Sequence, residues 1–534
     1  MKRSITATTA VLLTAATLFS GCARSGNSGR ERSDEDRKRG GETTVSSEPS
    51  ATDPAAAGEV NDPSIVANLA EPLEVNFVPA DYGRIIPYTG SVTEDEWGTP
   101  EETCYVRGFV DTYGVPVCDP IFDDIRYVAE YDAYIVRASE NGVSKYGFLS
   151  SNGAVFTGLI FDGASEVNDN RDNRACFYGT NYSDGKLTVT SLDNAFNALA
   201  QYNVTIDENA INIDAATAQL SVSNIYDNRA FVFNRDEFYP TYMLIDSNNG
   251  EVLYSTNALK VEKLVAYGNV IIEQDMGLEG LVVYDLNGEV ILDDENAYSW
   301  LVCDGEYMVA REGKLSLYDE DWEVIDSMDI AKNAVVYTSF EKIAVSEKGK
   351  TSVYDKDLNL LTVQDNVTMA DGSIEKDWYN YGEGDIYFTS FVGNERMYNL
   401  STGASIDLDM DFYYSFCGGY IFADNISNGN DEVRKWMVFD GDFKPLANGT
   451  GYAITFVDEI TGEAYFIASD AEKSVVYSID GTMLFECDRN CTYMSAMGGV
   501  FCATVDDQWV MYDKDGKLLF EYAIEHTGGF QISH

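Results

Sequence analysis

Short apolar runs separated by polar turns repeat along most of the chain. Within a run, Val, Ile, Tyr and Phe alternate with polar residues over five to seven positions, and Asp, Asn, Ser or Gly follow. A period of two is typical of strands with one buried face, and the turn residues mark their ends. The segment "YMVAREGKLSLYDEDWEVID", from Tyr307, therefore predicts three consecutive strands joined by "REGK" and "DEDW".

One phrase returns with a nearly constant period. "VVYDLNGEVI" at 282–291 has relatives such as "MLIDSNNGEVL", "VVYSIDGTMLF" and "VMYDKDGKLLF". Aligned on the residue after the tyrosine-like position, the phrases fall on Asp111, Ser150, Ser191, Asp246, Asp285, Asp319, Asp355, Asn399, Asp440, Ser478 and Asp513. The Asp-x-x-Gly core predicts a hairpin turn, because Asp can bond its own backbone and Gly readily adopts a positive φ.

These repeats predict an all-β, β-propeller-like array of about eleven units of about 40 residues. A sheet of three or four strands cannot bury both faces alone, so adjacent units must stack face to face. Eleven units exceed the four to eight blades of a typical propeller. The longest gap runs from Ser191 to Asp246, so we predict one β-repeat region over 63–225 and a propeller-like domain of seven to eight blades over 226–534. The alternative is an open β-solenoid or a string of sheets.

Residues 105–168 resemble the WG repeat of bacterial surface and secreted proteins. "YVRGFVDTYGVPVCDPIFDDIRYV" carries the Gly-Phe pair at Gly108 and Phe109, and Tyr146-Gly147 stands where the family often has Trp-Gly. The later units are similar to the generic blade of PQQ-like proteins, without its regular closing tryptophan. The resemblance implies an all-β binding or interaction module, and the WG family supplies no agreed catalytic residues.

The first 62 residues predict export and anchoring. Lys2 and Arg3 precede an apolar stretch that ends in small residues, which predicts a signal peptide over 1–21. The ending "LFSGC" resembles a lipoprotein lipobox, which implies that Cys22 is acylated; a membrane-spanning anchor is the alternative. Residues 22–62 are rich in Ser, Gly, Pro and charges and predict a flexible tether. We therefore expect a lipid-anchored protein on the extracytoplasmic face of a bacterial membrane.

Charge narrows the classes of partner. The chain has 36 basic and 89 acidic residues, a formal net charge of −53. Such a chain repels nucleic acid and anionic lipid, so we expect no nucleic-acid partner, and membrane contact only through the N-terminal lipid. A basic protein partner or divalent cations would be attracted. We expect a monomer in the absence of a partner.

Few residues have the types and spacing that enzymes use. Only His526 and His534 are present, which gives little support to a Ser-His-Asp triad or a Cys-His pair. "AVSEKGKT" at 344–351 is similar to the phosphate-binding loop motif, but Ala344 stands where the motif has its first glycine. Asp355, Asp357 and Asn359 are spaced like the start of a calcium loop, which leaves weak Ca²⁺ binding as the one cofactor to consider.

Eight cysteines besides Cys22 form no CxxC pair and give little support to a zinc site. Candidate local disulfides join Cys104 to Cys118, and Cys487 to Cys491 or Cys502; buried thiols are the alternative.

The predicted function is therefore non-enzymatic binding of a protein or a cell-envelope polymer by an anchored β-repeat lipoprotein, with Cys22 as its one predicted site residue. An extracellular hydrolase of glycans or peptides that uses a carboxylate pair is the alternative, as is an assembly scaffold for the envelope.

Overall fold

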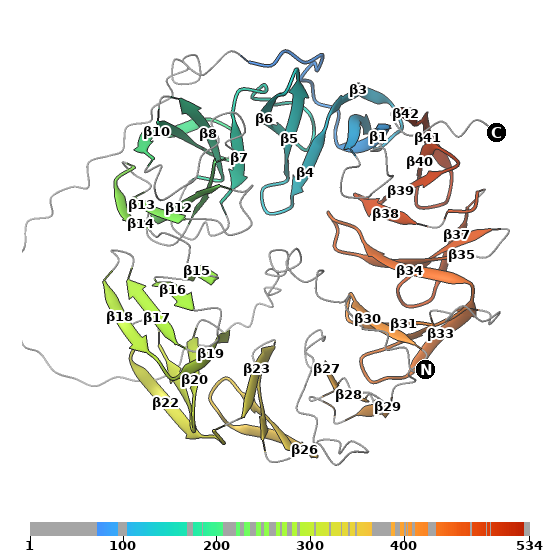
Figure 1. The fold of residues 1–534 in the computed structure, drawn as a ribbon. Helices are drawn as coiled ribbons and strands as arrows, with labels where there is room; N and C mark the ends of the chain where they lie inside the picture. Colours follow the sequence, from blue (N-terminus) through green and yellow to red (C-terminus); the bar gives the residue numbers. More distant parts are fainter. Residues whose placement is uncertain are drawn as a thin grey trace, which may run out of the picture. The chain divides into compact units, whose positions relative to one another are not determined.

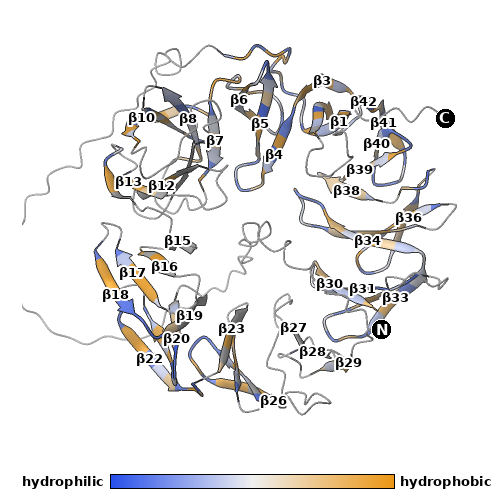
Figure 2. Cartoon of the chain, in the orientation of Figure 1, coloured by the Kyte–Doolittle hydropathy of each residue, from blue (hydrophilic) through white to orange (hydrophobic). Residues whose placement is uncertain are grey.

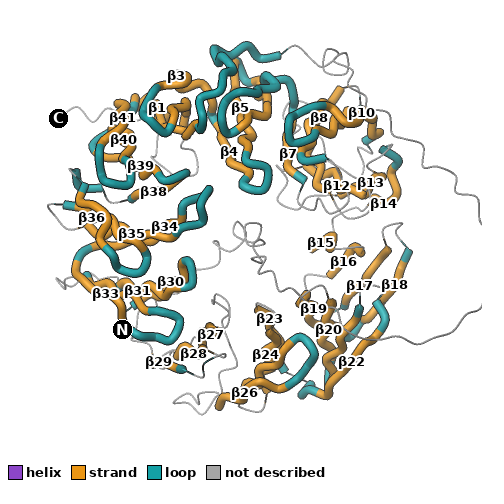
Figure 3. The backbone as a smooth tube through the Cα atoms, turned by 180° about the vertical axis from the view of Figure 1, so that it is seen from behind, coloured by secondary structure: helices purple, strands orange, loops and turns teal. Residues whose placement is uncertain are grey.

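The computed structural model describes residues 72–93, 104–167 and most of 175–527, with the longest gaps at 207–219 and 366–385. Cys22 and the predicted tether at 22–62 lie outside the described residues. Every regular element in the described part is a β-strand (Figure 1), and Figure 3 shows strands and loops but no helix there. Within these residues, no helix has the length and apolar character needed to cross a membrane. The all-β prediction is confirmed.

The described strands form eleven sheets, nine of four strands and two of three. The sheets nearest the N-terminus contain β1 (Ile85–Thr93), β2 (Cys104–Asp111), β3 (Pro116–Phe122); β4 (Asp124–Val128), β5 (Ala133–Glu140), β6 (Val143–Ser150); β7 (Gly163–Glu166), β8 (Phe177–Ser183), β9 (Lys186–Leu192), β10 (Ala198–Thr205); and β11 (Leu220–Asn224), β12 (Arg229–Asn234), β13 (Tyr242–Asp246), β14 (Val252–Ser255).

The next four sheets contain β15 (Lys263–Tyr267), β16 (Val270–Gln274), β17 (Leu281–Asp285), β18 (Val290–Asp294); β19 (Ala297–Cys303), β20 (Glu306–Arg311), β21 (Lys314–Tyr318), β22 (Val324–Asp329); β23 (Val335–Ser339), β24 (Lys342–Glu347), β25 (Lys350–Asp355), β26 (Leu360–Asp365); and β27 (Ile386–Thr389), β28 (Arg396–Asn399), β29 (Ser405–Asp407). The last three contain β30 (Tyr413–Cys417), β31 (Tyr420–Asp424), β32 (Lys435–Phe439), β33 (Pro445–Thr450); β34 (Tyr452–Val457), β35 (Ala464–Ser469), β36 (Ser474–Ser478), β37 (Met483–Glu486); and β38 (Met494–Met497), β39 (Val500–Val505), β40 (Gln508–Tyr512), β41 (Leu518–Ala523).

Strands that follow one another in the sequence pair antiparallel within each sheet, as in the order β15-β16-β17-β18. Short turns suffice for such a meander. The first sheet has a different edge: β42 (Glu525–Thr527) joins β1 in parallel, with Ser91 opposite Glu525 and Thr93 opposite Thr527. Both ends of the described chain therefore meet in one sheet.

The repeated phrase is a hairpin turn, as predicted. In the phrase at 513, the Lys517 N–H donates to Asp513 Oδ1 at 2.9 Å and the Asp513 N–H donates to the Lys517 carbonyl at 3.0 Å. Gly516 completes the turn with φ of +79°. One alignment was wrong. In the third unit the turn aspartate is Asp193, whose Oδ1 accepts from the Asn197 N–H, whereas Ser191 lies within β9. The weak spacing of "TSLDNAFN" allowed that two-residue shift.

Glycine is not required at every one of these turns. Phe196, Trp322, Leu358 and Phe443 take its place with φ between 57° and 62°. A bulky residue in this left-handed region costs about 1 to 3 kcal/mol, so something must offset it. Trp322 stacks on Tyr307 with ring centroids 4.6 Å apart and joins a core cluster with Val270 and Val283 of the preceding sheet. The aromatic turn residue thus contributes to packing between neighbouring sheets.

A β-bulge follows the turn in most sheets. Tyr284 pairs with Val290 and Val283 pairs with Leu292, which leaves Ile291 without a ladder partner. The same register shift leaves Ile325, Leu361, Leu446, Leu484 and Leu519 unpaired. A bulge of this kind bends the edge strand and increases its twist. The repeated apolar pair after each turn therefore marks a bulged edge strand.

The core lies between sheets rather than inside any one of them. One buried cluster joins Leu317 of β21 to Val345 of β24, and another joins Val476 of β36 to Val510 of β40. Figure 2 shows the apolar residues distributed along the strands of successive sheets. These clusters confirm the predicted stacking of neighbouring units. The largest cluster among the described residues combines side chains from 77–159 with side chains from 497–524.

Candidate functional site

Three hairpins, each between the first two strands of its sheet, are linked to one another by hydrogen bonds and by the side chain of Arg84. They are the β34–β35 turn at 458–463, the β38–β39 turn at 498–499 and the β4–β5 turn at 129–132. Two of these belong to the C-terminal sheets, whereas the third lies more than 300 residues earlier. Contacts between them therefore organise a surface that no single repeat contains.

Asp458 is the anchor of this arrangement. Its side chain is fully buried, and Oδ1 accepts hydrogen bonds from the N–H groups of Ile460 and Thr461 at 2.9 Å and Gly498 at 3.0 Å. Oδ2 accepts from Gly499 at 2.7 Å. Burial alone would raise the pKa of this carboxyl, but the four backbone donors outweigh it and the pKa is lowered. Asp458 is a structural anion that joins two hairpins.

Arg84 connects the C-terminal hairpins to the N-terminal sheets. A Cβ placed on Gly498 would lie 3.1 Å from Arg84 Cδ, so the arginine stem packs against this glycine. Its guanidinium forms a bidentate pair with Asp132, with distances of 2.9 and 3.0 Å. Such planar pairing fixes orientation as well as charge. Arg84 thus bridges the β38–β39 and β4–β5 hairpins.

Asp132 is held from several sides at a positive φ of 50°. The Tyr127 hydroxyl donates to Oδ1 at 2.7 Å and the Ser151 hydroxyl to Oδ2 at 2.8 Å. Burial raises the pKa of the carboxyl, but the hydrogen bonds from Tyr127, Arg84 and Ser151 have the larger effect. The pKa of Asp132 is lowered as a result. Asp132 is therefore ionised at neutral pH, with half of its side chain exposed.

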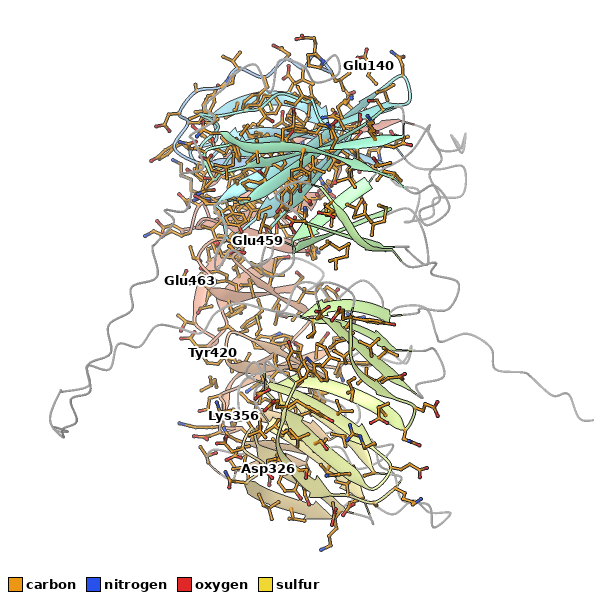
Figure 4. All side chains as sticks on the ribbon, turned by 90° about the vertical axis from the view of Figure 1, so that its left-hand side faces the viewer. Glu140, Asp326, Lys356, Tyr420, Glu459 and Glu463 are labelled. Atoms are coloured by element: carbon orange, nitrogen blue, oxygen red, sulfur yellow. The ribbon has the colours of Figure 1, made fainter. Side chains whose placement is uncertain are left out.

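Exposed carboxylates surround this framework. Glu130, Glu459 and Glu463 are all exposed on the hairpin turns, and Figure 4 labels Glu459 and Glu463. Partial desolvation of the carboxyl is the main cause that raises the pKa of Glu459, and the charge of Asp458 raises it further. We call Arg84, Tyr127, Glu130, Asp132, Glu459 and Glu463 the hairpin surface. It offers negative charge, with one tyrosine hydroxyl and one arginine fixed in place.

Asp424, a carboxyl outside the hairpin surface whose pKa is also shifted, lies at the C-terminal end of β31. Its Oδ1 is buried without a hydrogen-bond partner. Burial raises its pKa to about 6, against the opposing charge of Arg434, whose guanidinium lies 4.7 Å from the centre of the Tyr452 ring. Asp424 therefore titrates in a range where most carboxyls are already ionised.

Asp355, the first residue of the calcium-like spacing, is used by its own turn. Its Oδ1 accepts from the N–H groups of Asp357 at 3.1 Å and Asn359 at 2.8 Å, and its Oδ2 accepts from the Asn359 amide at 3.1 Å. Across the described residues, no cluster of three or more His, Cys, Asp or Glu side chains could hold a metal. The phosphate-loop imitation at 344–351 lies in the β24–β25 hairpin.

Among the described residues, the remaining predicted ones are not brought together into a site. Nε2 of His526 lies 3.2 Å from Oδ1 of Asp507. His534 and Cys22 are outside the described residues. Six described cysteines are buried thiols: Cys118, Cys176, Cys417, Cys487, Cys491 and Cys502. Burial raises the pKa of Cys118 to about 12. The hairpin surface was not predicted from the sequence. Its local signals there are the Gly498-Gly499 pair and the polar residues that follow Asp458.

No family model matches the chain, and no curated protein matches it. Among solved structures, the chain is similar to "Crystal structure of the eukaryotic initiation factor", at 10% identity and a TM-score of 0.33 over 64% of this chain and 96% of that one. It is also similar to Hsv2 of Kluyvelomyces marxianus, at 11% identity and a TM-score of 0.19 over 46% of this chain and 69% of that one. Similarities this weak carry no argument about function.

Proposed function

We propose that the chain is a lipid-anchored, extracytoplasmic binding module that closes into a β-propeller and uses the hairpin surface to bind a partner protein or a cell-envelope polymer. The proposal combines the predicted anchor at Cys22 with the exposed carboxylates at the hairpins. The observation that carries it is the connected set of contacts from Asp458 through Gly498 and Arg84 to Asp132.

Closure is supported by the way one sheet meets the next. A Cβ on the turn glycine Gly516 would lie 2.7 Å from Phe485 of the preceding sheet, and one on Gly481 would lie 2.4 Å from Ala447. In the first sheet, a Cβ on Gly114 would lie 2.3 Å from the carbonyl oxygen of Leu519, in the last sheet. The first sheet thus contacts the last through the same kind of glycine approach as these two sheets make to their predecessors, and β42 adds a backbone connection there.

Preorganisation is what makes the hairpin surface suited to binding. Asp458 and Asp132 fix the backbones and side chains of three hairpins before any partner arrives, so little conformational entropy remains to be lost on binding. Glu130, Glu459 and Glu463 stay exposed around them. Charges at the rim of an interface steer association with an oppositely charged partner. The partner or polymer should therefore present cationic groups.

A hydrolase is the less favoured function. Asp458 and Glu459 have pKa values shifted in opposite directions, the pattern expected of an acid and base pair. However, both carboxylate oxygens of Asp458 accept backbone hydrogen bonds, and its side chain is fully buried. Because Asp458 cannot reach a substrate, the pair supports hairpin structure rather than catalysis.

The test uses the full chain in detergent, presented to envelope extracts and to a glycan array, with analysis of any cleaved products. Saturable retention of one partner without cleavage is expected. The triple variant Glu130→Gln, Glu459→Gln, Glu463→Gln should weaken that retention about tenfold. The matched control is Glu140→Gln. Glu140 is the last residue of β5, whereas Asp132 precedes its first residue; Figure 4 labels Glu140. Release of glycan or peptide products would overturn the proposal.

The anchor is tested separately. A Cys22→Ser variant should appear in the soluble fraction and should fail to incorporate labelled fatty acid, since two acyl chains are needed for stable attachment. Membrane retention of this variant without label would contradict the lipid anchor while leaving the binding test unaffected.

A further inference from the structure

Three consecutive sheets expose an apolar pair at the start of their last strand. The pairs are Val290–Ile291, Val324–Ile325 and Leu360–Leu361, which we call the edge pairs. Their exposed fractions are 58% and 42%, 56% and 51%, and 56% and 45%. Figure 2 shows apolar colour on β18, β22 and β26, the strands that carry them. Single exposed apolar residues are normal, but a repeated pair at the same position needs an explanation.

The β-bulge explains how both members of a pair come to be exposed. Ile291, Ile325 and Leu361 are the residues that the register shift leaves without a ladder partner. In a regular strand, consecutive side chains would point to opposite faces and one of the two would be buried. The bulge also interrupts the free edge, so a partner strand cannot extend the sheet across it. Recognition at the edge pairs must therefore use side chains.

The exposure of this repeat position differs between sheets. Leu446 and Leu484, the bulged residues of two later sheets, are 40% and 37% exposed, less than the bulged residues of the edge pairs, and in the last sheet the position is covered. Leu519, the bulged residue of the last sheet, is partly buried against the core cluster shared with the first sheet. The position thus packs well when another segment lies over it. No described segment covers the edge pairs, whose side chains are 42% to 58% exposed.

The three sheets that carry the edge pairs are packed against one another. One buried cluster joins Val283 of β17 to Val309 of β20, and the next joins Leu317 of β21 to Val345 of β24. The edge pairs therefore belong to neighbouring sheets, and one partner segment can contact more than one of them.

The charge around the edge pairs selects the partner. Glu289 and Asp293 are exposed on either side of the first pair, and Glu323 and Asp326 on either side of the second; Figure 4 labels Asp326. Between positions 263 and 365 the chain has 22 acidic and 8 basic residues. A second copy would bring these acidic edges together, in a chain whose net charge is −53.

We propose that the edge pairs bind a cationic amphipathic segment of another protein, whose apolar side chains cover the pairs while its lysines or arginines face the flanking carboxylates. This site is separate from the hairpin surface and does not depend on the function proposed for it. Because apolar contact supplies affinity and charge supplies selection, binding needs both features in one segment.

The experiment uses the full chain in detergent and a fluorescent peptide of alternating lysine and valine, with anisotropy as the readout. Two comparison peptides replace every valine by serine or every lysine by glutamate. The lysine-valine peptide should bind at least about tenfold more tightly than either comparison peptide. Equal binding of the lysine-serine peptide would overturn the proposal, because charge alone would then explain the signal.

Variants locate the site. The triple variant Ile291→Ser, Ile325→Ser, Leu361→Ser should weaken binding of the lysine-valine peptide about tenfold. The control triple Val78→Ser, Val143→Ser, Val155→Ser changes apolar residues of similar exposure elsewhere and should bind as the unaltered chain does. Equal loss in both variants would overturn the assignment. Because all six side chains are exposed, both variants should unfold at the same temperature as the unaltered chain.

Discussion

The backbone N–H of Gly499 donates a 2.7 Å hydrogen bond to the carboxylate of Asp458, 41 residues earlier in the chain. Three further N–H groups point at the same buried carboxylate, so a negative charge is accommodated where burial alone would expel it. This one side chain therefore joins the β34–β35 and β38–β39 hairpins and supports the hairpin surface.

Asp458→Asn should destabilise the protein by about 2 kcal/mol or more at pH 7, because the amide presents a donor to N–H groups that need an acceptor. The measurement is urea unfolding followed by far-UV circular dichroism. Asp357→Asn, at an exposed turn position, is the control and should change stability by less than about 0.5 kcal/mol. Equal stability of the two variants would contradict the anchoring role.

The contribution of Asp458 should also depend on pH in a defined direction. Its folded-state pKa is lowered, so its stabilising effect is fully present above the unfolded value and is lost as the pH falls through the folded value. The difference in stability between the unaltered chain and Asp458→Asn should therefore shrink below about pH 4. A difference that stays constant down to pH 2 would contradict this.

Asp424 should show the opposite dependence. Its pKa is raised to about 6, so the folded state binds a proton more readily than the unfolded state between about pH 4 and 6. This group destabilises the folded state increasingly as the pH rises through that range. Asp424→Asn should stabilise the protein by about 1 kcal/mol at pH 7, after allowance for partial solvent screening, and have little effect at pH 4. Thermal unfolding across this range provides the measurement.

Gly114→Ala tests the contact between the first and last sheets. The substitution places a methyl group 2.3 Å from the Leu519 carbonyl oxygen at a φ of +87°. Gly313→Ala is the matched control, with a φ of +84° and no heavy atom within 4 Å of the new Cβ. Backbone strain should cost both variants about 1 kcal/mol, whereas Gly114→Ala should lose about 2 kcal/mol more. Equal losses would mean that the two sheets do not touch.

Removal of β42 tests the junction from the other side. A chain that ends at Ile524 loses the pairing of Glu525, His526 and Thr527 with β1. Its free energy of unfolding should be lower by about 1 to 2 kcal/mol, because about two or three backbone hydrogen bonds are lost. A chain that ends at Thr527 keeps β42 and serves as the control. Hydrogen exchange at Ser91 to Thr93 should quicken in the shorter chain alone.

The turns could be predicted from the sequence because their chemistry is local. Asp513 and Gly516 lie within one phrase, and the hydrogen bonds that define the turn span four residues. The conformation of Trp322 could not be predicted from its own turn. Trp322 occupies a glycine-like conformation because Tyr307 and the preceding sheet stabilise its ring, and those contacts cannot be read from the turn itself.

The hairpin surface could not be predicted because its contacts are distant in sequence. Arg84 and Asp132 are 48 residues apart, and neither belongs to the repeated phrase. Asp458 resembles many other acidic residues in a chain that has 89 of them, and burial rather than residue type distinguishes it. The repeats encode the stacking of the sheets, whereas the joins between hairpins depend on which sheets become neighbours.

The parallel pairing of β1 with β42 has a consequence for the order of folding. Ser91 is synthesised more than 400 residues before its partner Glu525. Loops of this length slow folding, because the entropy of closure is lost before the contacts form. The middle sheets can assemble from neighbours as they emerge, but the first sheet must wait for residues 525–527. Until then its edge is open to chaperones or to the same edge of another newly made molecule, so the synthesis of residues 525–527 is a checkpoint in the folding of this protein.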